Sequence, residues 1–413
     1  MIDLPTRILF ICHDGDLYGS QQSLNLLVRN LPQGEYQCFV SIARPGPLQK
    51  LLQGYPNTVV LRHKRLQWVK HDHRNLFQRV GDVLNLMVSA VPRTLYLLNT
   101  IRREKINLVH TNSSVSLEGA LAAALAGIPH VWHIRELFMT PSPKFHLILG
   151  RRFSRWFIDR FSDQVLCISS VVQQQFGRYL TQEPGKYVLL YNALELPAQP
   201  DFFPINDPQR AIMKTLSLKV FGLPDDKVFR VGYIGRLSAG KGFHELLEAI
   251  ALLRRKNVPV ELLVAGDFVD HEYKGRIHRA VQEECLKRSV HFLGYQQDLA
   301  PLYEAIDLLV VPSINEPFGR VVIEAAAQGV PCIGANAGGI PEIIESGLNG
   351  LLYPPGDVFA LAGMIEELMS AFWKLETLRQ NALRMVYERF NIETQIRTLC
   401  ECYQSILTRH QLL

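Results

Sequence analysis

The chain of 413 residues lacks the long apolar segments that would carry it across a membrane. No run of 18 apolar residues occurs, and the most apolar stretch, residues 80–98, is interrupted by Asp82, Pro92 and Arg93. The first residues contain no charged and apolar leader before a small-residue cleavage site, so we expect no signal peptide. These absences favour a cytoplasmic protein. Peripheral contact with the inner face of a membrane is compatible with that prediction.

Cysteine is scarce and irregularly spaced. The seven cysteines include no CxxC pair, and they occur at positions 12, 38, 167, 285, 332, 400 and 402. An odd count without metal-ligand spacing favours reduced, mostly buried thiols over a disulfide framework or a zinc site.

Two nucleotide-binding signatures are also missing. No GxGxxG follows the first apolar run, residues 8–12, which weakens a dinucleotide-binding interpretation. The turn at residues 236–242 contains Lys241 between glycines but has Gly242 where a P-loop has Ser or Thr.

The composition, 47% hydrophobic and 20% charged, is that of a soluble globular protein, and the length predicts two domains. Residues 1–199 carry 22 Lys and Arg against 13 Asp and Glu, while the remainder is acidic. The basic half can attract an anionic acceptor or membrane surface, or it is an ordinary solvated surface.

Short apolar runs alternate with helix-like segments along the whole chain. The predicted strands are residues 8–12, 39–42, 58–61, 108–110, 130–133, 164–168, 230–235, 261–265, 290–293, 308–312 and 331–334. Such alternation predicts an α/β fold with two doubly wound parallel sheets, facing each other across a cleft and binding ligands at the carboxyl ends of the strands.

The prolines at 197, 200, 204 and 208 predict a linker at residues 198–208. We therefore expect an N-terminal domain at residues 1–197 and a C-terminal domain at residues 209–385. The remaining residues, 386–413, include an amphipathic helix that we expect to pack back on the N-terminal domain.

Two carboxylates eight residues apart, Glu316 and Glu324, flank a Pro-Phe-Gly turn between a predicted strand and a helix. The backbone N–H groups of Phe318, Gly319 and Arg320 lie between them, and a helix N-terminus at a strand's carboxyl end binds anions. Carboxylates accept hydrogen bonds from sugar diols. The alternative is an ordinary helix-start Glu followed by a solvated Glu.

Arg236 and Lys241, five residues apart at a strand end and a helix start, could together hold a diphosphate. The alternative is two solvated cations near a turn. A Gly-rich loop, residues 334–342, follows the next strand and is either a tight connection or a part of the same site.

The first strand is followed by a loop in which Gly19 and Ser20 could present N–H groups to an anion. Asp14-Gly15-Asp16 spells DxD, a metal-binding pattern, but we expect no metal because the surrounding phosphate chemistry is cationic. His133 ends another strand and could bond a sugar hydroxyl or guide a proton, with a buried structural histidine as the alternative. His110 and Asn112 are weaker candidates.

Together, the segments GRLSAGKG, EPFGRVVIEAAAQGVPCIGANAGGIPEII and GLLYPPGD resemble the retaining glycosyltransferases of family four. The resemblance covers most of the chain and is strongest from Val231 to Asp357. It implies a GT-B fold, with two Rossmann-like domains, and transfer of a hexose-type sugar from a nucleotide diphosphate-sugar without a required metal or other cofactor.

The resemblance also assigns roles to individual residues. Arg236 and Lys241 correspond to the pair that holds the donor diphosphate, and Glu316 and Glu324 to the E-x7-E acids near the donor sugar and the ribose. The other predicted donor contacts are Gly19, Tyr295, Phe318, Gly319 and Arg320, and His133 corresponds to the histidine at the catalytic centre. The loop at Leu17–Ser23 and the segment at Asn192–Glu195 depart from the family's usual GGxE and Asn-Gly-Val-Asp, on the acceptor side.

The resemblance favours UDP or GDP as the nucleotide of the donor. It implies a role in the synthesis of a polysaccharide, a glycolipid or a small glycoside. The expected acceptor is a glycan, a lipid or a small molecule, and no nucleic-acid partner is expected. Front-face attack is preferred over Glu316 as a covalent nucleophile. The alternatives on this scaffold are a nucleotide-sugar epimerase, a phosphorylase and a non-catalytic nucleotide-sugar-binding subunit. The basic, Trp-containing segment 62–74 predicts peripheral contact with an anionic membrane, or a solvated loop followed by a helix folded into the core.

Overall fold

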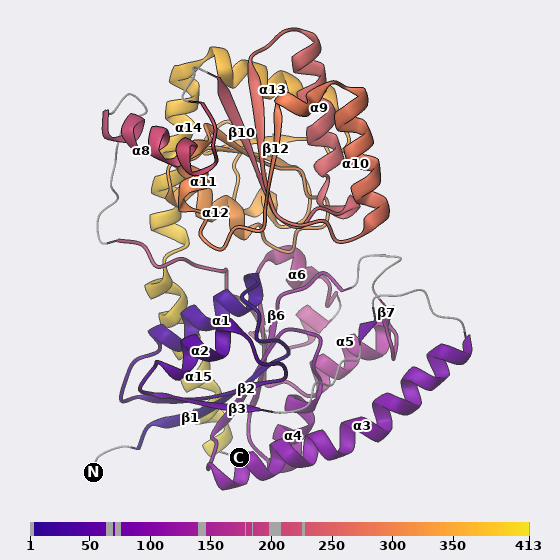
Figure 1. Ribbon diagram of the computed structural model, residues 1–413. Helices are drawn as coiled ribbons and strands as arrows, with labels where there is room; N and C mark the ends of the chain where they lie inside the picture. The colour runs from indigo at the N-terminus through magenta and orange to yellow at the C-terminus, as the bar shows by residue number, and fades with distance from the viewer. Residues whose placement is uncertain are drawn as a thin grey trace. The chain divides into compact units, whose positions relative to one another are not determined.

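The computed structural model describes residues 4–62, 69–70, 76–138, 146–177, 179–183, 185–197, 208–224 and 228–412. The chain divides into two compact units (Figure 1). Unit 1 is Met1–Ala193 with Ile392–Leu413, and unit 2 is Leu194–Asn391. The predicted linker at 198–208 lies almost entirely outside the described residues, and the basic segment at 62–74 lies largely outside them.

Unit 1 is built on a seven-stranded parallel sheet with the order β3-β2-β1-β5-β6-β8-β9. Its strands are β1 (Thr6–Cys12), β2 (Tyr36–Ile42), β3 (Thr58–Arg62), β5 (Leu108–Asn112), β6 (His130–Ile134), β8 (Gln164–Cys167) and β9 (Tyr187–Leu189). A separate antiparallel pair joins β4 (Val69–Lys70) to β7 (His146–Leu147). The sequence predicted six of the seven sheet strands and missed β9, which is only three residues long.

Both faces of this sheet are covered by helices because its strands are apolar on both sides. Ile8 and Phe10 of β1 pack into one core cluster with α1 (Gly19–Asn30), α2 (Pro47–Gln53) and α15 (Ile392–Gln411). Leu9 and Ile11 point the other way, toward α3 (Leu76–Arg103) and α4 (Glu118–Ala126). The remaining helices of unit 1 are α5 (Arg151–Arg160), α6 (Ser170–Gln174) and α7 (Tyr179–Gln182).

The last helix, α15, belongs to unit 1 although the helix before it in the chain belongs to unit 2. Its apolar face, which includes Leu399, Tyr403 and Ile406, is buried in the unit 1 core. The chain therefore passes from one unit to the other twice, between Ala193 and Leu194 and between Asn391 and Ile392.

Unit 2 contains a six-stranded parallel sheet with the order β12-β11-β10-β13-β14-β15. The strands are β10 (Phe229–Ile234), β11 (Val260–Ala265), β12 (Val290–Gly294), β13 (Leu308–Val311), β14 (Cys332–Ala335) and β15 (Leu351–Tyr353). The sequence did not predict β15.

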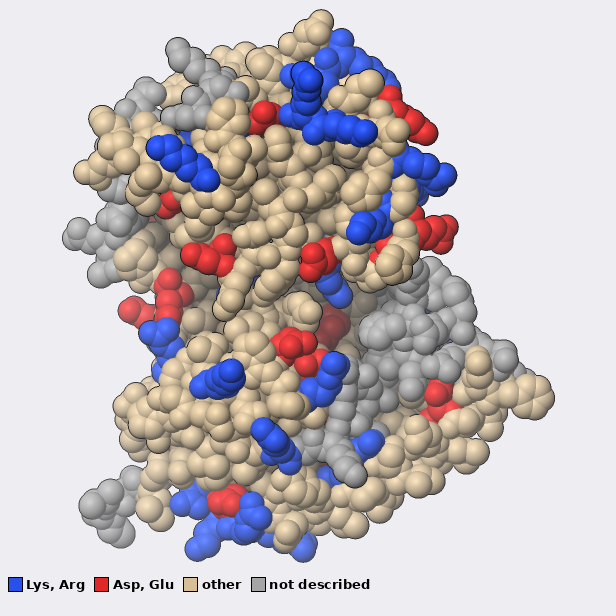
Figure 2. Space-filling view, in the orientation of Figure 1, with Lys and Arg blue, Asp and Glu red and all other residues tan. Residues whose placement is uncertain are grey.

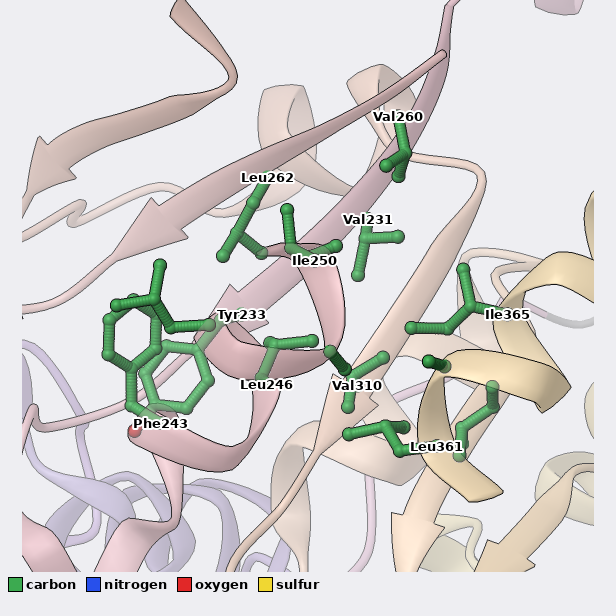
Figure 3. Packing of buried hydrophobic residues seen from close by; sticks show 14 of the residues in the cluster. Val231, Tyr233, Phe243, Leu246, Ile250, Val260, Leu262, Val310, Leu361 and Ile365 are labelled. Carbon is green, nitrogen blue, oxygen red and sulfur yellow. The ribbon is translucent and has the colours of Figure 1, made fainter. Parts of the chain in front are cut away.

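The core of unit 2 forms where the sheet meets α9 (Phe243–Arg255) and α13 (Val358–Ser370). Val231 and Tyr233 of β10 pack against Phe243 and Leu246 of α9, and Leu361 of α13 closes the same cluster (Figure 3). The helices and 3-10 turns of unit 2 are α8 (Pro208–Val220), η1 (Ala239–Lys241), α9 (Phe243–Arg255), α10 (His271–Glu283), η2 (Leu286–Arg288), α11 (Ala300–Ala305), α12 (Arg320–Ala327), η3 (Ile340–Glu342), α13 (Val358–Ser370) and α14 (Phe372–Arg389).

Both sheets reverse their strand order at one point, and such switch points create crevices at the carboxyl ends of the strands. In unit 1 the reversal lies between β1 and β5, and in unit 2 between β10 and β13. Most of the candidate residues follow the strands at or beside these two points.

Candidate active site

The unit 2 switch point brings together the loops that follow β10 and β13, which contain Lys241 and Glu316. Gly242, directly after Lys241, has a φ of +67°, and a Cβ on it would lie 1.9 Å from the carbonyl oxygen of Pro312. Only glycine permits both this backbone conformation and this close approach. As a result, Lys241 Nζ lies 2.6 Å from Glu316 Oε2.

The Gly-rich loop after β14 supports the Glu316 loop from the next strand end. Gly338 has a φ of +59°, and a Cβ on it would lie 2.3 Å from the carbonyl oxygen of Glu316. The Gly339 amide donates to that same oxygen at 2.8 Å. The sequence left open whether this loop is only a tight connection or also a part of the site. The contacts favour the latter, because the loop holds the backbone at Glu316 in addition to connecting a strand to a turn.

The start of α12 turns its two charged side chains toward each other. Gly319, with a φ of +108°, precedes the helix, and Arg320 Nε donates to Glu324 Oε1 at 2.6 Å. The Tyr303 hydroxyl donates to Glu324 Oε2 at 3.3 Å, and burial together with this carboxylate raises the pKa of Tyr303 well above its usual value. Tyr303 was not predicted from the sequence.

The side chain of Phe318, between Glu316 and Arg320, is buried. It packs against Phe390, with the ring centroids 5.6 Å apart. The contact predicted between Phe318 and a donor sugar is made by the backbone amide, so a buried ring is compatible with that prediction. Arg236 is exposed after β10, where the Tyr233 hydroxyl donates to its carbonyl oxygen at 3.0 Å. Tyr295 follows β12 and is 58% exposed, so its ring is accessible to a ligand.

The first loop of unit 1 places Gly19 at the exposed start of α1. Asp14 of the DxD sequence is engaged within its own loop: its Oδ1 accepts from the Gly15 amide at 2.8 Å, and its Oδ2 lies 3.4 Å from Arg44 Nη1. Among the described residues, no group of three or more His, Cys, Asp or Glu side chains is arranged to hold a metal ion.

His133 is fully buried at the end of β6, and its two ring nitrogens have different surroundings. Nδ1 lies 3.3 Å from Arg135 Nη2, which can only donate, so Nδ1 accepts and the proton resides on Nε2. Nε2 has no hydrogen-bond partner within the described part of the chain. Burial first, and then the Arg135 charge, hold the pKa of His133 well below its usual value, so the ring is neutral at physiological pH.

Arg135 organises the polar groups around His133. Its guanidinium donates to Asn112 Oδ1 at 2.6 Å and to Asn192 Oδ1 at 2.8 Å. Asn192 also accepts from Ser23 Oγ, which ties α1 to the same cluster. The sequence marked Asn112 as a weak candidate but gave no role to Arg135, although its position two residues after a strand-end histidine was the available signal.

A second buried histidine, His110, lies beside His133, with the ring centroids 5.4 Å apart. Its Nδ1 is 2.6 Å from the hydroxyl of Tyr403, which α15 contributes. Burial is the main cause that lowers the pKa of His110 well below its usual value. Tyr403 lies 293 residues from His110 in the chain, so no local sequence pattern could have linked the two.

Comparisons with known proteins agree with this architecture. The Glycosyltransferase Family 4 model matches residues 19–196, and the Glycosyl transferases group 1 model matches residues 217–385. An uncharacterized glycosyltransferase of Methanocaldococcus jannaschii is 28% identical over 233 residues, 56% of this chain and 57% of that protein. D-inositol 3-phosphate glycosyltransferase of Corynebacterium urealyticum is 31% identical over 184 residues, 43% of each protein. These alignments span about half the length of the curated relatives.

Among solved structures, HepE of Anabaena in complex with UDP-glucose has a TM-score of 0.76 and 25% identity over 97% of this chain and all of that one. Crystal structures of the same protein with UDP, and with UDP and glucose, have TM-scores of 0.76 and 0.77. These comparisons confirm the predicted GT-B fold, with its two parallel-sheet α/β domains.

Proposed function

This chain belongs to the GT-B glycosyltransferases, and we propose that it transfers a hexose-type sugar from a UDP-sugar to a hydroxyl of a glycan, lipid or small-molecule acceptor, with retention of the anomeric configuration. The observation that supports the donor site best is the pairing of Lys241 with Glu316 at the switch point of unit 2. UDP is preferred over GDP because HepE, similar over its full length, was crystallised with UDP-glucose.

In the proposed complex, the donor separates the ion pair between Lys241 and Glu316. Both side chains remain partly exposed, at 26% and 16%, so a ligand can reach them. Lys241 and Arg236 would bind the diphosphate, and Glu316 would accept hydrogen bonds from the sugar hydroxyls. Glu324, held by Arg320 and Tyr303, would receive the ribose, and Tyr295 would contact the base.

Transfer then breaks the bond between the anomeric carbon and the diphosphate oxygen. The acceptor oxygen forms its bond to that carbon on the same face, and its proton passes to the departing phosphate oxygen. Negative charge develops on the diphosphate, where Lys241, Arg236 and the start of α12 stabilise it. Because these are cationic groups and helix dipoles, we propose that the reaction needs no metal ion.

His133 fits a hydrogen-bond donor better than a proton acceptor in this scheme. Its ring is buried and neutral, and its Nε2–H has no hydrogen-bond partner among the described residues. The nearby Arg135 charge disfavours protonation of the ring to imidazolium. We therefore assign His133 to a sugar hydroxyl and the deprotonation of the acceptor to the leaving phosphate. An epimerase or a non-catalytic subunit would use the same donor site without forming a product that contains the acceptor.

The proposal is tested by combining binding with turnover. A thermal-shift series with UDP, GDP and ADP should show the largest rise in midpoint with UDP, because a ligand stabilises the native state by RT ln(1 + [L]/Kd). Release of UDP from UDP-glucose should depend on an added acceptor and persist in EDTA. A product of inverted configuration, activity restored only by Mn²⁺, or epimerised UDP-sugar without transfer would each contradict a part of the proposal.

A second proposal concerns the membrane, and one feature of α3 favours it. Seven apolar side chains lie within an arc of about 100° on this helix, over roughly 27 Å of its length. They are 53–88% exposed: Phe77, Val80, Leu84, Met87, Val88, Val91 and Leu95. The alternative prediction, a helix folded into the core, is wrong for this face, and Figure 2 shows the area over α3 as largely uncharged.

We propose that this stripe lies on an anionic lipid surface. The sequence just before α3 contains five Lys and Arg residues and Trp68 between positions 62 and 74. Cations close in sequence to an exposed apolar stripe complement anionic lipid headgroups, whereas they would disfavour pairing of two copies of the same region. Among the described residues no helix is long and apolar enough to span a membrane.

Liposome co-sedimentation tests the docking proposal. The wild-type chain should bind phosphatidylserine vesicles more strongly than neutral ones at low salt, and a variant with Leu84→Glu and Val88→Glu should lose most of this binding. Asn85→Glu, an exposed change on the same helix outside the stripe, is the matched control. Equal binding to both kinds of vesicle would contradict the docking proposal. It would also be contradicted if the wild-type chain formed a dimer that the Leu84→Glu and Val88→Glu variant dissociates, because the stripe would then be a contact between two copies.

A further inference from the structure

A concave pocket of about 560 Å³ on unit 1, separate from the residues discussed so far, is lined by Arg152, Phe153, Arg155, Trp156 and Tyr179. We propose that it binds an acidic sugar of the acceptor, a saccharide unit that carries a carboxylate or phosphate. This inference rests on the proposed glycosyl transfer and adds the chemical class of the acceptor. The volume of the pocket lies within the range of roughly 300–1,000 Å³ that is typical of small-ligand pockets.

Arg155 is held in place before any ligand arrives. Its Nη1 donates to the Gln175 carbonyl oxygen at 3.2 Å, and its guanidinium carbon lies 5.8 Å from the centre of the Tyr179 ring. Its Nε is buried and has no hydrogen-bond partner within the residues that the structure describes. A fixed guanidinium with unused donor capacity suits the paired oxygens of a carboxylate or phosphate, and Arg152 lies one turn away on the same helix.

The aromatic side of the pocket consists of Phe153 and Trp156, whose ring centroids are 5.3 Å apart. These rings are 40% and 44% exposed, so a large part of their surface is not used in the core. Phe157 and Phe161 pack beneath them, at 6.0 Å from Phe153 and 6.3 Å from Trp156, and hold the pair in position. An aromatic surface beside a cation matches a sugar, which has an apolar C–H face as well as polar edges.

The pocket is connected to the cluster around His133. Gln175, which accepts from Arg155, donates through its Nε2 to the Glu136 carbonyl oxygen at 2.9 Å. Glu136 directly follows Arg135, the residue that contacts His133 Nδ1. Because β6 and β8 are parallel and α5 connects them, α5 begins on the side of the sheet where β6 ends. The first turns of α5 therefore lie at the same edge as His133.

The arrangement favours a saccharide over a lipid surface at this position. A bilayer contacts a convex or flat face, whereas Arg155 lies in a hollow, where a carbonyl group and an aromatic ring hold its guanidinium. The acid can belong to a uronic acid or to a sugar phosphate, since both present paired oxygens, and the experiment includes each.

Isothermal titration on the full chain with saturating UDP tests the proposal. The probes are a glucuronic-acid-containing disaccharide, the neutral disaccharide of the same linkage, and glucose 6-phosphate. At least one acidic probe should bind at least tenfold more tightly than the neutral disaccharide. Arg152→Gln with Arg155→Gln should remove this preference, and Arg155→Lys, which keeps the charge but not the fork, should retain only a part of it.

Arg160→Gln is the control, since it removes the same charge from α5 outside the pocket. All variants should keep the wild-type midpoint of unfolding and the shift produced by UDP. An unchanged UDP shift with no acid preference would overturn the pocket while the donor site stands; a lost UDP shift in the wild type would overturn the proposed function. Binding of phosphatidylserine vesicles through Arg152 and Arg155, without binding of any acidic saccharide, would assign the pocket to lipid and overturn the proposal.

Discussion

At the scale of single residues, the charged side chains predicted to bind the donor form ion pairs with one another. Lys241 contacts Glu316, and Arg320 contacts Glu324. Each pair is partly exposed, so it contributes little to stability, typically about 0–1 kcal/mol. A weak pair can be separated at low cost by a ligand that offers a diphosphate to the cation and hydroxyl groups to the carboxylate.

Replacing Lys241 by Ala should therefore reduce catalysis much more than stability. The variant loses a cation that faces the leaving diphosphate, an interaction worth on the order of 3 kcal/mol, or roughly a hundredfold in kcat/KM. Steady-state kinetics with UDP-glucose measure the loss, and thermal unfolding checks the fold. Lys256→Ala, which removes an exposed cation paired with Glu366, should leave both unchanged. Wild-type kcat/KM in Lys241→Ala would refute the diphosphate assignment.

His133 leads to a prediction about pH. Burial and the Arg135 charge hold the pKa of His133 well below its usual value, so the ring is neutral at neutral pH and its protonation should produce no inflection in kcat/KM near pH 6.5. His133→Phe, which removes the Nε2–H donor, should lower kcat/KM by roughly 10- to 100-fold, the cost of about 1–3 kcal/mol for an unmade buried hydrogen bond. The shape of the pH profile should not change. An acidic limb near pH 6.5 that disappears in the variant would show that His133 titrates during catalysis.

At the scale of elements, glycines set the distances between the loops of the donor site. Gly242 allows the loop after β10 to contact Pro312, and Gly338 allows the loop after β14 to contact Glu316. The sequence indicated that these glycines lie at strand ends. Their partners depend on the strand order β10-β13-β14, which only the folded sheet defines.

Two glycine substitutions separate backbone strain from contact with the site. Gly338→Ala and Gly347→Ala both introduce a side chain at positive φ, which costs roughly 1–2 kcal/mol in each case. Only at Gly338 does the new Cβ meet the Glu316 carbonyl oxygen; at Gly347 nothing lies within 4 Å. Both variants should lose stability in denaturant unfolding, but Gly338→Ala should lose more and should alone lose most of its activity. Equal activity in the two would mean that the position of the Glu316 loop is not critical.

The predicted strands were largely confirmed because a parallel sheet covered on both faces is apolar throughout, which makes runs such as Ile8–Cys12 visible in the sequence. The helix α3 illustrates the limit of that reasoning. Its apolar residues are numerous enough to suggest burial, yet one side faces the unit 1 core through Leu97 and Ile101 while the stripe at Leu84 and Val88 is exposed. Periodicity alone does not distinguish a helix with one buried face from one with two apolar faces.

At the scale of the whole molecule, residues distant in the chain complete each unit. α15 returns to unit 1 and supplies Tyr403 to His110, and Leu194 bonds through its amide to Phe390 where the chain leaves unit 2. Phe390 in turn packs on Phe318, in the loop after β13 that contains Glu316. The buried polar cluster of unit 1 thus includes a side chain from α15. The sequence indicated its histidines and Asn112, but it did not indicate the contacts that Arg135 and Tyr403 make with them.

The buried histidines of unit 1 should make this unit sensitive to acid. His130 is hydrogen-bonded as a neutral ring to the Phe161 carbonyl and Thr111, and burial lowers its pKa to about 4. Between pH 6.5 and 4 the unfolded chain binds a proton that the folded chain excludes, so stability falls as the pH decreases through this window. For His130 alone the full effect is about 3 kcal/mol, and His110 and His133 act in the same direction.

Guanidinium unfolding followed by tryptophan fluorescence measures this effect, and Trp132, a buried ring 5.3 Å from His130, is one of the four tryptophans that contribute to the signal. The midpoint should be constant above pH 7 and decrease steadily from pH 6.5 to 4.5. His130→Gln should be less stable at pH 7.5, because the hydrogen bonds of the ring are lost, but its midpoint should depend less on pH. His271→Asn, at the exposed start of α10, should keep the wild-type slope. A wild-type midpoint that is flat down to pH 4.5 would mean that these rings are solvated, and it would also remove the basis for treating His133 as a neutral donor.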